Sequence, residues 1–127
     1  MLLKIDFESE VPIYVQIKNE IIEGIAKKEL LPGDSLPSVR QLAEDIGVNM
    51  HTVNKAYGLL RSQDFITMDR RKGAVINQTG NHITEEYINN LNKDMMGIVA
   101  EAYCRGMKKE EFIEICSEIF KIYNEEE

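Results

Sequence analysis

Two short stretches of this sequence hold the side chains with the most specific chemistry. The first begins near Met50 and collects amide, imidazole, hydroxyl, thioether and ammonium groups: Asn49, Met50, His51, Thr52, Asn54 and Lys55. An Asn side chain can pair with adenine through two hydrogen bonds, and a Met side chain can contact a thymine methyl group. A hydroxyl near a helix start suits a phosphate. These residues are therefore candidates for contacts with duplex DNA.

The second stretch is a run of adjacent cations, Arg70, Arg71 and Lys72, followed by Gly73. Neighbouring positive charges repel one another, and Asp69 offsets only one of them. A polyanion would relieve this repulsion. We therefore expect the stretch from Arg70 to Gly73 to contact nucleic acid as well.

Apolar residues at helical spacing predict the element that carries the first stretch. Val53, Ala56, Tyr57 and Leu60 fall at i, i+3, i+4 and i+7, which predicts a helix over residues 50–63 with one buried stripe. The polar residues described above then lie on its outward side.

The same spacing recurs just upstream, in Val39, Leu42, Ala43 and Ile46. Only Gly47, Val48 and Asn49 separate the two stripes. Gly47 suits the left-handed residue that ends the first helix, and Asn49 suits the N-cap of the second, where it would accept from the amide of residue 51 or 52. Ser38, followed three residues later by Gln41, fits a capping box. The pattern is typical of a helix-turn-helix.

Short β-prone runs flank the cationic stretch, at residues 65–68 and 74–76, and predict a hairpin with the cations at its tip. A helix-turn-helix followed by a basic hairpin predicts a winged helix-turn-helix that binds duplex DNA. The alternative interpretation of the two helices is an ordinary helical hairpin in an all-α core.

We expect the N-terminal part of the chain to pack under the helix-turn-helix as a scaffold. In residues 1–11 the apolar side chains of Leu3, Ile5 and Phe7 alternate with polar ones, which predicts a short strand or an arm packed on the domain. Pro12 suits the first turn of a helix. That helix would bury Ile17, Ile21 and Ile25.

Five blocks of this sequence are similar to the corresponding parts of the DNA-binding domain of the GntR family of bacterial transcription regulators. The blocks are Pro12–Ile17, Leu31–Ala43, Gly47–Asn49, Thr52–Val53 and Ala56–Tyr57. The similarity runs from Pro12 to Ile76. The stretch from Asn49 to Tyr57 and the short helical remainder resemble the YtrA-like subfamily, whose members carry a small two-helix dimerisation segment instead of a large effector domain. The resemblance implies an operator DNA partner.

The resemblance also implies a role for Arg40, because the corresponding arginine of the family reaches DNA. Arg40 falls at the second position of its predicted helix. A positive charge there interacts unfavourably with the helix dipole, at a cost of about 0.3 kcal/mol or more. We expect Arg40 to contact a phosphate or a guanine, beside Ser38 in the same DNA-binding set. The alternative is a solvated arginine or one paired with Glu44.

The sequence departs from the family pattern at three places. The first turn of the recognition helix has Asn-Met-His at residues 49–51 where many members have an arginine, which puts guanine recognition from this turn in doubt. Asp64 stands where the family has Gly before the wing, and Asp tolerates the left-handed region. Arg71 replaces a wing glycine, so an arginine side chain could enter a narrow minor groove.

The C-terminal part predicts two further helices, one capped by Thr84 and broken near Gly106, and one from about residue 109. Their apolar stripes give the predicted dimerisation residues: Tyr87, Leu91, Met95, Ile98, Phe112, Ile115, Ile119 and Phe120. Two helices alone bury too little surface to be stable, so they need the first domain or a second copy of the chain. A small-ligand pocket lined by Tyr87 and the Met95–Met96 pair is the alternative.

Composition limits the possible classes of protein. The chain has 127 residues, 43% of them hydrophobic, which is enough for one domain and a small appendage. The net charge of −7 is concentrated in residues 81–127, which contain eleven acidic and five basic residues, whereas residues 38–76 carry +2. We expect Cys104 and Cys116 to be small core or interface residues. Without an apolar run of about 18 residues or a signal peptide, we expect a cytoplasmic protein with no membrane partner.

These inferences combine into one expectation. The fold class is mainly α (α+β), with a winged helix-turn-helix at residues 1–77, a polar linker at 78–83 (the polar run itself begins at Asn77) and a helical dimerisation segment at 84–127. We expect a homodimeric repressor of a pseudo-palindromic operator, without enzyme activity, catalytic residues, cofactor or metal. The alternatives are a switch of the same fold that responds to a small-molecule effector, and a protein-interaction adaptor that does not bind DNA.

Overall fold

The computed structural model describes residues 3–80 and 83–124. Residues 81–82 of the predicted linker and the acidic end at 125–127 lie outside the described residues. The chain divides into two compact units, Met1–Thr79 and Gly80–Glu127, and each is described by itself. Mainly helical, with one small sheet, the chain has the predicted fold class.

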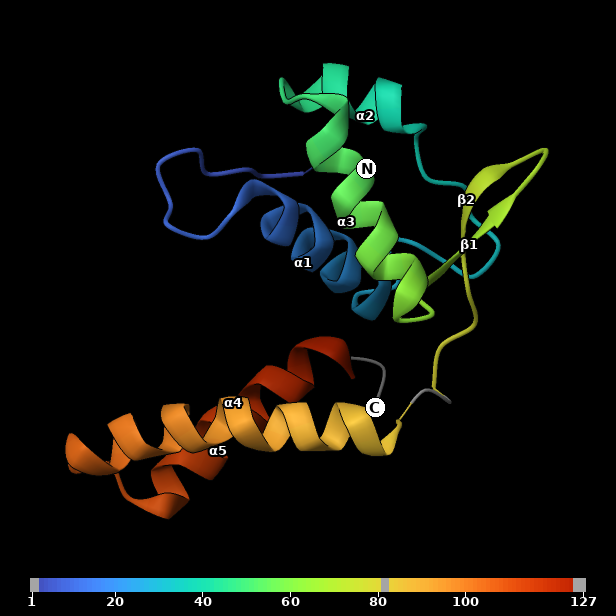
Figure 1. Ribbon diagram of the computed structural model, residues 1–127. Coiled ribbons are helices and arrows are strands. Elements are labelled where there is room, and N and C mark those ends of the chain that lie inside the picture. The colour runs from blue at the N-terminus through green and yellow to red at the C-terminus, as the bar shows by residue number, and fades with distance from the viewer. Residues whose placement is uncertain (1–2, 81–82, 125–127) are drawn as a thin grey trace. The chain divides into compact units, whose positions relative to one another are not determined.

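The first unit contains three helices and a hairpin: α1 (Ile13–Ala26), α2 (Val39–Ile46), α3 (Met50–Ser62), β1 (Ile66–Asp69) and β2 (Gly73–Ile76). Helix α3 packs against both α1 and α2, and it leads to the base of the hairpin (Figure 1). The predicted stripes form the core. Its fully buried large side chains are Ile17, Ile21, Val53, Leu60, Ile66 and Ile76.

The turn between α2 and α3 has the predicted caps. Gly47 adopts a left-handed conformation with φ of 72° and ends α2. The Asn49 side chain accepts a hydrogen bond from the Thr52 amide and begins α3. At the start of α2 only half of the predicted capping box forms, since Ser38 accepts from the Gln41 amide while the Gln41 side chain donates to Asp45 Oδ1.

The hairpin is the predicted wing. Its antiparallel register pairs Ile66 with Ile76 at the buried base and Asp69 with Gly73 at the tip. The segment before α2 adds a bridge between Ser35 and Val75, which fixes the hairpin to the body of the unit. Asp64, just before β1, has a φ of 65°. It therefore takes the left-handed conformation expected for a position where the family has Gly.

The N-terminal segment is an arm, and residues 3–12 form no strand. Leu3 and Ile5 pack against the core, whereas Phe7 is 61% exposed, so the packed arm uses Leu3 and Ile5 but not Phe7. Phe7 lies in a local turn that is closed by a hydrogen bond from the Ser9 amide to the carbonyl of Asp6. Backbone amides of the arm hydrogen-bond to the side chains of Gln16 and Glu20 on α1.

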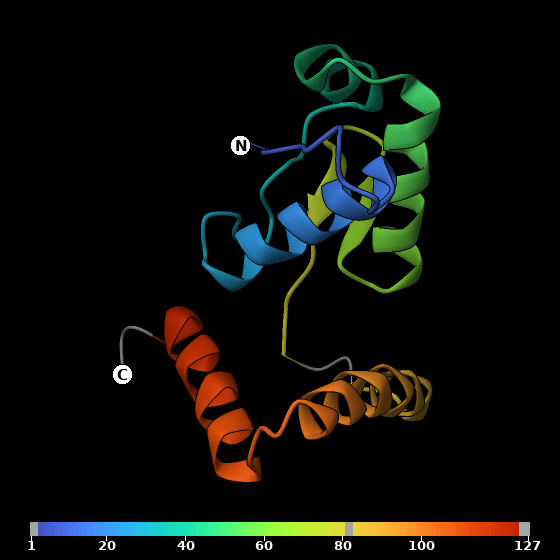
Figure 2. The same cartoon turned by 90° about the vertical axis from the view of Figure 1, so that its left-hand side faces the viewer.

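The second unit consists of α4 (Glu85–Cys104) and α5 (Lys109–Tyr123), joined by a short turn at Gly106. Thr84 caps α4 as predicted, by accepting from the Tyr87 amide at 3.0 Å. The two helices open from the turn as a V (Figure 2), and neither contains a buried residue. Cys104 is exposed and Cys116 is half-buried, so neither is a core residue of a single chain, and an interface role for them stays a prediction. Among the described helices, none is long and apolar enough to cross a membrane.

Candidate nucleic-acid interface

The outward face of α3 presents the predicted polar set. Its buried stripe fixes how the helix is rotated, so Met50, His51, Asn54 and Lys55 lie in solvent, with Met50 47% exposed. Thr52 is half-buried beside its cap. The first two turns of the helix thus offer a thioether, an imidazole, an amide and an ammonium group on one accessible surface.

Asn49 has less freedom to bind a base than its residue type suggests. Its Oδ1 accepts from the backbone amide of Thr52 at 2.8 Å and from the Thr52 hydroxyl at 2.9 Å. Both lone pairs of that oxygen are therefore occupied. The Nδ2 group of Asn49 can still donate to DNA, but a two-bond pair with adenine also needs a free acceptor. Asn54 is the Asn on this face whose side chain makes no such bond in the described part of the chain.

The start of α2 offers a second pair of predicted groups. Ser38 Oγ accepts the Gln41 amide at 3.1 Å, which leaves its hydroxyl hydrogen available for an external acceptor. Arg40 is exposed, and no acidic side chain among residues 3–80 and 83–124 forms an ion pair with it. The alternative pairing with Glu44 is therefore not formed among the described residues.

A buried tyrosine connects these two surfaces. The Tyr57 hydroxyl on α3 donates to the carbonyl of Pro37, which directly precedes the Ser38 cap, at 2.7 Å. Burial raises the pKa of Tyr57 well above its usual value, so the hydroxyl keeps its hydrogen at any physiological pH. This bond fixes the start of α2 relative to α3.

Replacing Tyr57 by Phe should lower the free energy of unfolding by about 1 kcal/mol, because the Pro37 carbonyl loses its partner. Urea denaturation would measure the change. Tyr14→Phe is the matched control, since no described residue is hydrogen-bonded to the Tyr14 hydroxyl, and it should leave the stability of the protein unaltered. Equal stability of Tyr57→Phe and the unsubstituted protein would contradict this role of the bond.

The tip of the wing is ordered by Asp69. Its Oδ1 accepts the backbone amides of Arg71 at 2.7 Å and Lys72 at 3.0 Å. These two hydrogen bonds hold the pKa of Asp69 below its usual value, and the bond from the Lys72 amide has the larger effect. The carboxylate is thus charged at neutral pH, and its support of the turn is lost only as the pH falls through the lowered pKa. Gly73 has a φ of 77°, and Arg70, Arg71 and Lys72 are exposed.

Asn77 supports the base of the wing, although the polar composition there suggests that a linker begins at this residue. Its Oδ1 accepts from the Thr67 hydroxyl at 2.6 Å, and its Nδ2 donates to the Asp64 carbonyl at 2.9 Å. The Asn77 amide also donates to the carbonyl of Phe65. If the predicted pairing of the hairpin is extended by one residue beyond Ile76, it includes Asn77. This is the sequence signal that could have assigned Asn77 to the wing.

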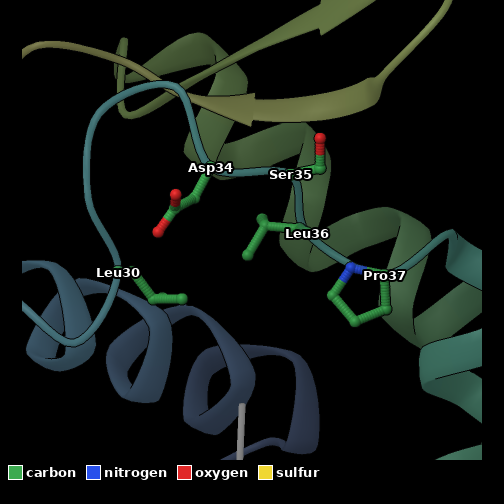
Figure 3. A pocket seen from close by; sticks show the side chains of 5 residues that line it. All are labelled: Leu30, Asp34, Ser35, Leu36 and Pro37. Atoms are coloured by element: carbon green, nitrogen blue, oxygen red, sulfur yellow. The ribbon is translucent and has the colours of Figure 1, made fainter.

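A shallow hollow of about 470 Å³ lies beside the segment that leads to α2, lined by Leu30, Asp34, Ser35, Leu36 and Pro37. In Figure 3 the Leu30 side chain, from the turn that follows α1, and those of Asp34 and Leu36 border the hollow. Asp34 Oδ2 accepts the Leu31 amide at 2.8 Å and so closes the turn around Gly33. The carboxylate of this hollow therefore already has a structural function.

The predicted dimerisation residues all lie in the second unit. Six of them are exposed on α4 and α5: Tyr87, Leu91, Ile98, Ile115, Ile119 and Phe120. Met95 and Phe112 are half-buried. Phe120 is 66% exposed, which is unusual for a residue in the middle of an apolar stripe. The second unit thus presents many apolar side chains on its surface.

Comparison with known proteins identifies the family. Residues 13–76 match the family model of bacterial regulatory proteins of the gntR family. The chain is 33% identical over 119 residues to the HTH-type transcriptional repressor YtrA of Bacillus subtilis, covering 93% of this chain and 92% of the relative. The solved structure of YtrA from Sulfolobus acidocaldarius, a GntR-family transcription factor, is 44% identical with a TM-score of 0.66, and the match covers 79% of this chain and 99% of that one.

A structure with DNA is also similar. The AraR DNA-binding domain in complex with operator ORX1 is 30% identical to this chain with a TM-score of 0.53, over 60% of this chain and 98% of that domain. The chain therefore belongs to the GntR family, as a YtrA-like DNA-binding transcription regulator.

Proposed function

We propose that this protein represses transcription as a homodimer that binds a pseudo-palindromic operator in the cytoplasm. The observation that carries the proposal is the first turn of α3, where a buried stripe and a side-chain cap hold exposed polar groups in a fixed orientation. Such a helix can enter the major groove with its N-terminal residues against the base edges. Ser38, Arg40 and the wing cations would contact the flanking backbone.

Weak net basicity supports a role for base contacts. Residues 38–76 carry a charge of only +2, so the affinity for DNA of any sequence should be modest. Specific contacts and two-fold symmetry must then supply much of the affinity. The base-reading set would be Asn54, Met50 and His51, with the Asn49 amide as an additional donor.

The surface of the second unit supports the proposed homodimer. Helices α4 and α5 bury none of their residues, although they carry apolar side chains along their length. Exposed apolar patches of this kind mark surfaces that bind another molecule. A second copy of the same two helices would cover them, and the two-fold axis would place two recognition helices about 34 Å apart on one face of the duplex.

Repression is the sign of regulation that the relatives support, because the Bacillus subtilis relative is named a transcriptional repressor. A dimer bound in this way would repress transcription by occupying its operator.

Selection from a pool of random duplexes, with sedimentation of the same protein sample, tests the proposal. A two-fold symmetric motif bound by a dimer is the expected result. If a well-folded dimer enriches no motif, the operator-binding proposal is wrong, and the protein-interaction adaptor becomes the better hypothesis.

The wing makes its own prediction about salt. Replacing Arg71 and Lys72 by Ala should make the dependence of log Kobs on log salt shallower by about one unit for each phosphate that the variant no longer neutralises. Fluorescence anisotropy across a salt series would measure the slope. A variant with Lys93→Ala and Lys109→Ala removes the same charge from α4 and α5, outside the proposed DNA-binding surface, and should keep the original slope. The same slope in the wing variant would remove the wing from the interface.

A further inference from the structure

One contact joins the scaffold helix to the recognition helix through exposed chemistry. The Nζ atom of Lys55, on α3, lies 4.1 Å from the centroid of the Tyr14 ring, on α1. At this distance an ammonium group is attracted to the negative face of the ring. The two residues are far apart in the sequence, and only the packing of α1 against α3 brings them together.

The two partners differ in mobility. Tyr14 lies in the first turn of α1 and packs against the hydrophobic core, so its ring is a fixed platform. Lys55 is exposed, and a lysine side chain in solvent samples many rotamers. The ring therefore restricts the lysine, while the lysine has little influence on the ring.

An aromatic partner preserves the charge that a carboxylate would neutralise. Lys55 forms no ion pair in the described ranges, so its full positive charge stays available. The ammonium group has three N–H donors, and a ring on one side leaves donors free on the other. Lys55 lies one turn after His51, on the same exposed side of α3 as the residues proposed to read bases.

We propose that Tyr14 is a positioning residue for DNA binding, whose ring holds the Lys55 ammonium group in place as a preformed contact to a DNA phosphate. This inference rests on the proposed operator binding. Holding the lysine before DNA arrives reduces the entropy that is lost on binding. A phosphate contact is independent of base sequence, so the pair should strengthen binding to all duplexes alike.

A double-mutant cycle on the selected operator tests the inference, with Tyr14→Leu, Lys55→Gln and the double variant. Lys55→Gln should make the salt dependence of log Kobs shallower by about one unit. Tyr14→Leu should weaken binding by about 2- to 5-fold. Tyr14→Phe, which keeps the ring, should bind like the unsubstituted protein. In the Lys55→Gln background Tyr14→Leu should have no further effect.

Three outcomes would overturn the inference. Tyr14→Leu could weaken binding equally in both backgrounds, which would indicate a general role in folding. It could leave binding unchanged, or it could tighten binding, which would mean that the ring withholds Lys55 from DNA. If Tyr14→Leu does not fold, fluorinated phenylalanines at position 14 keep the shape of the ring and withdraw charge from its face. Affinity should then fall with each added fluorine, and constant affinity would contradict the inference.

The failure of this inference can be distinguished from failure of the proposed function. A symmetric operator bound by a dimer without coupling between Tyr14 and Lys55 would remove the positioning role alone. Absence of any selected operator would remove the proposed function itself.

Discussion

Replacing Phe120 by Glu should convert the proposed dimer to a monomer and weaken operator binding by about 10²- to 10⁴-fold. Phe120 is the most exposed apolar residue of α5. In the proposed interface a carboxylate at this position would lose its hydration without gaining a partner, which is strongly unfavourable. Each recognition helix would then bind its half-site alone, without the avidity that linkage to a second one provides. Sedimentation and operator titration measure the two effects.

Ser117→Glu is the matched control for that variant. Ser117 is an exposed polar residue of the same helix and lies outside the apolar stripe, so the added charge should leave both the dimer and the affinity unchanged. A dimeric Phe120→Glu protein with full operator affinity would show that α5 is not the interface.

Replacing Asn54 by Ala should weaken binding to the selected operator by about 1–3 kcal/mol and relax specificity at one base pair. The reason is the occupied acceptor of Asn49: a two-bond contact with adenine needs a free oxygen and a free amide, and Asn54 has both. Repeating the selection with the variant measures the change in base preference, and titration of the original operator measures the change in affinity.

Asn49→Ser is the control here, because a Ser side chain can replace the cap of α3. This variant loses only the Nδ2 donor of Asn49, so it should keep the preference for adenine that the two-bond contact of Asn54 provides. If Asn49→Ser instead loses an adenine preference and Asn54→Ala keeps it, the assignment of the two Asn residues is reversed.

Local sequence signals were sufficient to predict the helices and hairpin of the first unit. The stripe of Val53, Ala56, Tyr57 and Leu60 is buried as expected, and Gly47 and Asn49 end and begin their helices as predicted. These features depend on periodicity and on the chemistry of a single turn. For the same reason the exposed cations of the wing could be predicted from residues 70–72 alone.

Contacts between distant elements could not be predicted in this way. The Tyr14 ring meets Lys55 only after α1 packs on α3, and the bond from Tyr57 to Pro37 joins residues that no local pattern relates. Asn77 looks like a linker residue until the hairpin register brings it beside Phe65. The Gln41 side chain could hydrogen-bond either to the backbone amide of Ser38 or to Asp45. It bonds to Asp45, which lies one turn along the same helix.

Prediction of the chemistry of the site was limited by the same difficulty. The residue types at 49–55 predict which groups face outward, but not which oxygen is already accepting a hydrogen bond. Thr52 illustrates this point, because its hydroxyl donates to Asn49 and must turn away from it before it can donate to a phosphate. The role expected of Thr52 as a phosphate ligand stays a prediction.

The stoichiometry of the complex tests the central claim most directly. Native mass spectrometry of the protein with the selected symmetric operator, and with a single half-site, would count the chains on each duplex. We predict two chains on the full operator, with a half-site affinity that is lower by about 10²-fold or more. One chain bound to the full operator, with equal affinity for the half-site, would contradict the account of a two-fold dimer built on α4 and α5.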